Sequence, residues 1–157
     1  MILLNTNVVS EPLKSKPSAR VIEWLDRQAA ETLYLSAITN AELRFGVVRI
    51  AGGRRRNDLA VKVGQVLDLF RDRMLNFEVE AAEHLAQILA ATEKPGRKIP
   101  DPNAYLAAIA MARGFAVANR DVEHFQGTGV SVINPWEQAP HARHSSCLKK
   151  VDPSSLM

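Results

Sequence analysis

Cysteine is almost absent from this chain of 157 residues, and long hydrophobic runs are missing. The one cysteine, Cys147, excludes an internal disulfide and favours a reducing compartment, so we expect a cytoplasmic protein. No stretch approaches the roughly 20 consecutive apolar residues of a membrane span. The N-terminus also lacks the basic start and the apolar run of a signal peptide. We therefore expect no membrane partner.

Excess charge is also small. The net charge is +3, of which residues 138–157 carry +2 and the first 137 residues carry +1. The basic residues of the first 137 form three local clusters, at 14–20, 54–56 and 94–98. Such clusters contact phosphates in some proteins, but they are more often simply solvated surface. Charge alone therefore does not identify a nucleic-acid-binding protein.

Composition and periodicity set the domain boundaries. Hydrophobic residues make up 46% of the chain and charged residues 24%, as in ordinary globular proteins. From Gln138 onward no periodic apolar pattern remains. We therefore predict one domain over residues 1–137 and a flexible C-terminal tail over residues 138–157.

Strand-like and helix-like segments alternate along the predicted domain. Short apolar runs bounded by turn-forming residues predict strands at 1–4, 33–36, 76–79, 115–118 and 130–133. Apolar residues at helical spacing predict helices at 21–28, 39–48, 57–73, 80–92 and 101–113. This alternation predicts an α/β fold with a mostly parallel sheet covered by helices on both faces.

The first predicted strand ends abruptly at Asn5-Thr6-Asn7. Ligands of open α/β sheets bind at the carboxyl ends of the strands, and three acids, Glu42, Asp101 and Asp121, are expected at that same edge. Carboxylates gathered there would repel one another unless a cation lay among them. Hard oxygen donors suit Mg²⁺ or Mn²⁺, which activates water and neutralises a phosphate.

Each acid also has an ordinary structural interpretation. Glu42 completes a capping box that begins at Thr39, and Asp101 precedes Pro102 as an N-cap. Asp121 would serve in a turn or as an N-cap. Taken singly, the structural role is the commoner one for each acid, and only their convergence on one edge favours a site.

Five motifs recur in order over residues 1–136: M-I-L-L-x-T-N-V-x-S-E-P at the start, Y-L-S-A-I-T-x-A-E-L-R-F-G at 34–46, A-Y-L-A-A-I-A at 104–110, R-D at 120–121 and I-N-P-W at 133–136. Together they resemble the PIN-domain toxins of the VapC/FitB type. The resemblance implies a five-stranded parallel sheet in the order 3-2-1-4-5, flanked by helices. It also implies a Mg²⁺- or Mn²⁺-dependent endoribonuclease toxin of a type II toxin–antitoxin pair.

The resemblance implies partners as well. Members of this family are usually homodimers that act on RNA. A cognate, VapB-like antitoxin covers the active-site groove and supplies the DNA-binding part, so the toxin reaches operator DNA only through the antitoxin.

Four positions of this sequence match the family's metal-binding and catalytic acids: Asn5, Glu42, Asn103 and Asp121. Two of them are amides here, so Glu42 and Asp121 are the acids that remain. By the same resemblance, Thr6 and Asn119 would orient water or the ligands. The RNA phosphates would face Arg44 and Arg120, and exposure for solubility is as common a role for these arginines.

The loss of two carboxylates should weaken metal binding greatly. A divalent ion at about 4 Å from one carboxylate gains on the order of 8 kcal/mol at an effective dielectric near 20, before desolvation is subtracted. An asparagine keeps an oxygen of similar shape without the charge. Three explanations of the amides remain open. They were introduced to disable the enzyme, they are natural in this chain, or Asp101, two residues before Asn103, supplies part of the missing charge.

Two functions of different classes follow from the pair of amides. In the first, the chain is an endoribonuclease toxin of weakened or abolished activity. In the second, it is an inactive module that binds antitoxin within operator-bound complexes.

Overall fold

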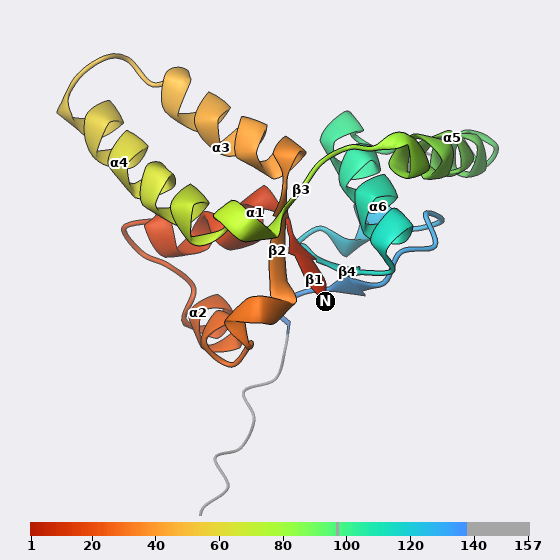
Figure 1. Cartoon of the computed structure of the whole chain (residues 1–157), viewed down its shortest axis with the longest axis horizontal. Helices are drawn as coiled ribbons and strands as arrows, with labels where there is room; N and C mark the ends of the chain where they lie inside the picture. The colour runs from red at the N-terminus through yellow and green to blue at the C-terminus, as the bar shows by residue number, and fades with distance from the viewer. Residues whose placement is uncertain (97, 138–157) are drawn as a thin grey trace, which may run out of the picture.

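The structure is a computed structural model, and it describes residues 1–96 and 98–137 (Figure 1). Five strands form the sheet: β1 Ile2–Leu4, β2 Leu33–Ser36, β3 Met74–Leu75, β4 Ala116–Ala118 and β5 Val132–Ile133. The α-helices of the described residues are α1 Thr6–Val9, α2 Ala19–Asp26, α3 Ala37–Val48, α4 Arg54–Leu69, α5 Val79–Glu93 and α6 Asp101–Arg113. Short 3₁₀ turns lie at Glu11–Leu13, Ala30–Thr32, Arg71–Arg73 and Val122–Phe125.

The strands are all parallel and lie in the order β3-β2-β1-β4-β5. In the centre of the sheet, Ile2 of β1 is in register with Leu33 of β2 and with Ala116 of β4. The predicted α/β fold and strand order are therefore confirmed. The strands β2 and β3 lie on one side of β1, and β4 and β5 lie on the other. The strand order therefore reverses at β1, and α/β proteins place their sites at the carboxyl end of the strands at such a switch point.

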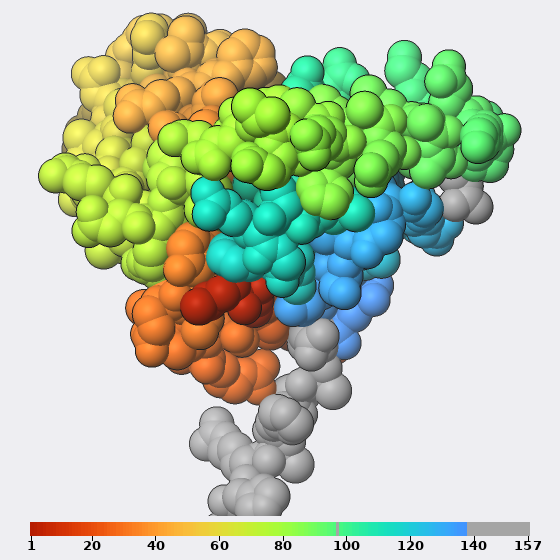
Figure 2. Space-filling view, turned by 45° about the vertical axis from the view of Figure 1, so that its right-hand side comes forward, coloured from red at the N-terminus to blue at the C-terminus, as the bar shows by residue number. Residues whose placement is uncertain are grey.

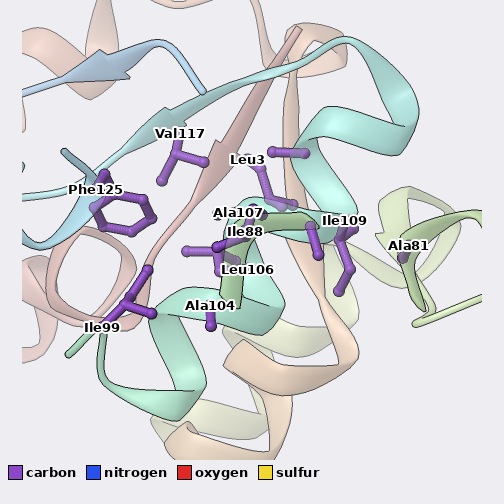
Figure 3. Close-up of a cluster of buried hydrophobic side chains, with 12 residues drawn as sticks. Leu3, Ala81, Ile88, Ile99, Ala104, Leu106, Ala107, Ile109, Val117 and Phe125 are labelled. Atoms are coloured by element: carbon purple, nitrogen blue, oxygen red, sulfur yellow. The ribbon is translucent and has the colours of Figure 1, made fainter. Parts of the chain in front are cut away.

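The two faces of the sheet bury two separate hydrophobic cores. Leu3 and Val117 point into the core formed with α5 and α6 (Figure 3). The next residues along the same strands, Leu4 and Ala118, point into the other core, which holds side chains of α2, α3 and α4. Alternate residues of a strand face opposite sides, so both faces of β1 and β4 are buried. This burial explains why both strands are runs of apolar residues.

The helices form layers on the two faces of the sheet. In Figure 1, α3 and α4 pack together on one side and α5 and α6 on the other. Figure 2 shows α5, in green, lying across α6, in teal, at the surface. The alanines of α6 allow this close approach, and Ala104, Ala107, Ala108 and Ala110 are all buried.

The third strand was predicted at the wrong residues. It comprises Met74 and Leu75, which pair with Leu35 and Ser36 of β2, and not residues 76–79. The alternating pattern of 76–79 has another cause, because Phe77 packs against the α5/α6 core while Val79 already begins α5 and is exposed. A helix was also predicted at 57–73. It begins at Arg54 and ends at Leu69, and the remainder forms the 3₁₀ turn Arg71–Arg73.

The first strand was predicted to end in a turn at Asn5-Thr6-Asn7, but Thr6–Val9 form the one-turn helix α1. Asn5 is its N-cap, and the Asn5 side chain accepts a hydrogen bond from the Thr6 N–H. Among the described residues, no helix combines the length and apolar character needed to cross a membrane. The tail predicted at 138–157 lies outside the described residues.

Candidate functional site

An open pocket of about 430 Å³ lies at the carboxyl edge of the sheet. The structure brings together here the four residues predicted as metal-binding and catalytic, Asn5, Glu42, Asn103 and Asp121, and Thr6 lines the pocket with them. They come from separate elements: the end of β1, the helix after β2, the first turn of α6 and the loop after β4. Residues nearly 120 positions apart therefore share one site because the parallel sheet aligns the ends of its strands.

The side chain of Asn5 makes three hydrogen bonds. Its side-chain oxygen accepts from the Thr6 N–H at 2.7 Å, which caps α1. Its amide nitrogen donates to Asn119 Oδ1 at 3.0 Å and to Asn103 Oδ1 at 3.3 Å. The group that Asn5 presents to its neighbours across the site is therefore N–H₂, while its oxygen faces the Thr6 N–H.

Asn119 is a buried residue that hydrogen-bonds to segments forming the pocket. It is only 1% exposed, and its nitrogen donates to the Asp121 carbonyl oxygen at 3.2 Å. Its oxygen accepts from both Asn5 and Asn7. Asn119 thus connects the end of β1 to the loop that carries Asp121.

The capping box predicted at Thr39 and Glu42 is wrong. The helix begins earlier, because Ser36 is the N-cap and its hydroxyl accepts from the Thr39 N–H at 3.0 Å. Glu42 therefore lies in the second turn of α3, where a capping role is out of reach. Its carboxylate instead accepts a 2.6 Å hydrogen bond from the hydroxyl of Thr6, which joins α3 to the end of β1.

The N-cap predicted at Asp101 is also wrong. Pro100 occupies the N-cap position, and Asp101 is the first helical residue, exposed to solvent. Pro100, Pro102 and Asn103 line the pocket, whereas Asp101 is not among the lining residues. Asp121 is exposed at the start of the 3₁₀ turn Val122–Phe125, and its side chain makes no cap hydrogen bond.

Some residues at the site were missed. His124 lines the pocket, and its Nδ1 lies 3.3 Å from the amide nitrogen of Asn103. Asn7 lines the pocket beside Asn119. No spacing rule could have found His124, because it reaches the pocket through a 3₁₀ turn whose position depends on the packing of Phe125 in the core.

The two arginines predicted to face RNA lie outside the pocket lining. Arg44 is exposed and donates to Asn40 on its own helix at 2.8 Å. The guanidinium of Arg120 stacks over Trp136 at 5.4 Å from the ring centroid. Cation–π stacking of this kind fixes the side chain against the protein surface.

A basic groove of about 870 Å³ was not predicted as a site. Its charged lining residues are Lys14, Lys16, Arg54, Arg55, Lys62 and one acid, Asp58. A smaller hollow shares Lys14 with this groove and shares Thr6 and Glu42 with the pocket. The basic groove therefore continues into the candidate site, and it combines two of the basic clusters seen in the sequence, 14–20 and 54–56.

The pocket holds only two of the four carboxylates that the resemblance implies for a divalent-cation site. Of the four predicted ligands, only Glu42 and Asp121 are acids, and the Asn5 oxygen already accepts one hydrogen bond, from the Thr6 N–H. The amide nitrogen of Asn5 holds the oxygens of Asn103 and Asn119, which a cation would otherwise bind. Within the described part of the chain, no group of three or more His, Cys, Asp or Glu residues is arranged to hold a metal.

Comparisons with known proteins give a consistent result. The model of the PIN domain family matches residues 2–129. VapC ribonuclease Y4jK of Sinorhizobium fredii is 44% identical over 88% of this chain and 100% of its own. Toxin FitB of Neisseria gonorrhoeae is 44% identical over 87% of this chain and 99% of its own. The structure of FitAB bound to the IR36 DNA fragment contains a chain with a TM-score of 0.84 and 42% identity, covering 90% of this chain and 100% of that one.

Proposed function

The chain belongs to the PIN-domain family, and on this basis we propose that it is the endoribonuclease toxin of a type II toxin–antitoxin pair, with weakened activity. The observation that carries the proposal is the convergence of Asn5, Glu42, Asn103 and Asp121 on one pocket. The similarity to a VapC ribonuclease and to toxin FitB supports it over nearly the whole length of both proteins.

Nucleases of this family generally depend on a divalent metal. In this chain Glu42 and Asp121 would hold Mg²⁺ or Mn²⁺, while positions 5 and 103 supply no charge. Mg²⁺ is often bound through only one or two carboxylates, with substrate phosphates and water completing its shell. Two acids are therefore enough for residual metal binding and activity. The N–H₂ group of Asn5 weakens that metal binding, because it holds the oxygens of Asn103 and Asn119.

Thr6 and Asn119 act as positioning residues in this proposal. The Thr6 hydroxyl fixes one carboxylate oxygen of Glu42 at 2.6 Å, and Asn119 anchors the loop that carries Asp121. We assign RNA phosphate contacts to the basic groove, whose lysines and arginines continue toward the pocket. This assignment replaces Arg44 and Arg120, which lie outside the lining.

The partners of the proposal follow from the similarity to FitB. FitB forms the FitAB complex, which has been solved on a DNA fragment. We propose that this chain, as a homodimer in the cytoplasm, binds a VapB-like antitoxin through the domain of residues 1–137. Operator DNA would then be contacted by the antitoxin.

RNA cleavage tests the proposed activity. The chain and its Asn5→Asp/Asn103→Asp variant are incubated with total RNA and Mg²⁺, with a further Glu42→Gln substitution in the variant as the matched control. We expect the variant to cleave at least 100-fold faster than the unaltered chain, because two charges return to the site, and the control to lose this gain. If the restored variant does not cleave RNA, the nuclease assignment is contradicted.

The orientation of Asn5 favours a second candidate function, in which the chain binds antitoxin without catalysis. FitA, the partner of FitB in the solved complex, is the available probe. Co-expression should recover a stable complex of the unaltered chain with FitA, while its RNA cleavage stays at background. A chain that cleaves RNA at the rate of the restored variant contradicts this second function.

A further inference from the structure

Asn5 lies at the centre of a connected set of side-chain amides. Its nitrogen donates to Asn103 at 3.3 Å and to Asn119 at 3.0 Å, and Asn7 donates to the same oxygen of Asn119. These residues come from β1, α1, α6 and the end of β4. One amide group therefore ties together the elements that form the pocket.

In the hydrogen bonds around Asn5, each donor faces an acceptor. The Asn119 nitrogen is used on the Asp121 carbonyl oxygen, so its oxygen must face Asn5 and Asn7. The Asn103 nitrogen lies 3.3 Å from His124 Nδ1, and its oxygen accepts from Asn5. Asn5 in turn uses its oxygen on the Thr6 N–H. Rotating the Asn5 amide by half a turn would break each of its three hydrogen bonds.

We infer that the Asn5 amide nitrogen replaces a cation in holding this edge together, so that position 5, and not position 103, decides whether the fold needs metal. The oxygens of Asn103 and Asn119 converge on the N–H₂ group, as oxygens converge on a bound ion. The inference concerns folding stability and does not depend on RNA cleavage.

The two positions differ in what an acid does to the set. Asn103→Asp leaves the Asn5 N–H₂ in place, and its acceptor becomes a carboxylate, which strengthens the hydrogen bond. Asn5→Asp removes the donor, so a carboxylate oxygen meets the oxygens of Asn103 and Asn119. Asn119 Oδ1 keeps Asn7 as a donor and Asn103 lines the open pocket, so the cost is the repulsion between the carboxylate and two neighbouring oxygens, and a divalent cation is the group that would relieve it.

Thermal melting in EDTA and in Mn²⁺ tests the inference on the full chain. In EDTA we expect the unaltered chain and Asn103→Asp to melt at nearly the same temperature, while Mn²⁺ stabilises Asn103→Asp only as a bound ligand does. Asn5→Asp should melt about 5 °C or more lower in EDTA, and Mn²⁺ should recover at least half of that loss. An Asn5→Asp variant that folds only with Mn²⁺ would support the inference in the same way.

Asn134→Asp is the matched control. Asn134 is also buried, its oxygen also accepts a backbone N–H, from Trp136 at 3.0 Å, and its nitrogen donates to the Arg120 carbonyl at 3.1 Å. Its variant should lose stability that Mn²⁺ does not restore. The inference is overturned if Asn5→Asp melts like the unaltered chain in EDTA, if Mn²⁺ does not stabilise it, or if Asn103→Asp loses as much stability in EDTA.

A second measurement covers the case in which Asn5→Asp does not fold in either buffer. The side-chain N–H₂ signals of Asn5 in the unaltered chain should exchange slowly with solvent and should not shift when Mg²⁺ is added. Fast exchange, or a shift on addition of Mg²⁺, would show that the amide does not hold the neighbouring oxygens. Since neither experiment measures cleavage, failure of the nuclease proposal would leave the result unchanged.

Discussion

Glu11 is a buried carboxylate that the proposed function does not use. It is 4% exposed, its Oε2 accepts from Lys14 Nζ at 2.5 Å, and its Oε1 accepts from the Ser18 N–H at 2.8 Å. Burial alone would raise the pKa of Glu11. The hydrogen bonds from Lys14 and Ser18, with the charges of Lys14 and Arg120, outweigh burial and hold the pKa below its ordinary value of 4.5.

This lowered pKa predicts an acid-dependent loss of stability. The ionised form is favoured in the folded chain, so Glu11 stabilises fully above pH 4.5 and loses its contribution as the pH falls through the folded pKa. Urea unfolding at a series of pH values should show a decline below pH 4.5 that Glu11→Gln reduces. At pH 7 the variant should be about 1–3 kcal/mol less stable, because charged hydrogen bonds are lost. An unchanged pH dependence would contradict this account.

At the scale of the residue, the sequence predicted which side chains meet but not how they interact. The motifs placed Asn5, Glu42 and Asp121 at one edge, since a parallel sheet aligns the ends of its strands. The Asn5 oxygen caps α1 through a contact with the next residue, but the partner of its nitrogen, Asn119, lies 114 positions away. Such contacts have no signature in local spacing.

At the scale of the element, α3 determines where Glu42 lies. Ser36 caps this helix, and the hydroxyl of Thr39 lies 3.3 Å from the Leu4 carbonyl oxygen, so the start of α3 is tied to the end of β1. The true cap lies three residues before the predicted one. Both hydroxyl residues are buried and followed by plausible helical sequence. What distinguishes them is the hydrogen bond from the Thr39 N–H to the Ser36 hydroxyl.

Ser36→Ala tests the importance of this cap. The variant loses the acceptor for the Thr39 N–H, and we expect it to be about 1 kcal/mol less stable in urea unfolding. Ser36→Asp restores a capping oxygen but buries a charge, so it should not recover full stability. Stability equal to that of the unaltered chain in Ser36→Ala would show that the helix does not depend on this cap.

The other misplaced elements are short ones. The third strand has two residues and α1 has four, too few for periodicity to define. Their positions follow from pairing with β2 and from the Asn5 cap. The longer segments, whose apolar faces repeat several times, were located within a few residues.

At the scale of the whole molecule, the basic groove predicts how RNA binds. Arg55 and Lys62 line the groove, whereas Arg27 and Lys94 lie outside its lining and serve as the control pair. Replacing Arg55 and Lys62 by Gln should weaken binding of single-stranded RNA in EDTA. It should also lower the slope of log affinity against log salt by about 1.4, for two lost phosphate contacts. Fluorescence anisotropy at several salt concentrations measures both, and equal effects from the control pair would refute the groove assignment.

The central claim is that two amides, Asn5 and Asn103, weaken the metal site of an otherwise intact toxin fold. Calorimetric titration of Mn²⁺ into the unaltered chain and into Asn5→Asp/Asn103→Asp measures this directly. We predict saturable binding by the restored variant and at least 100-fold weaker binding by the unaltered chain. Equally tight binding by both would contradict the claim, because Glu42 and Asp121 would then suffice to hold the ion.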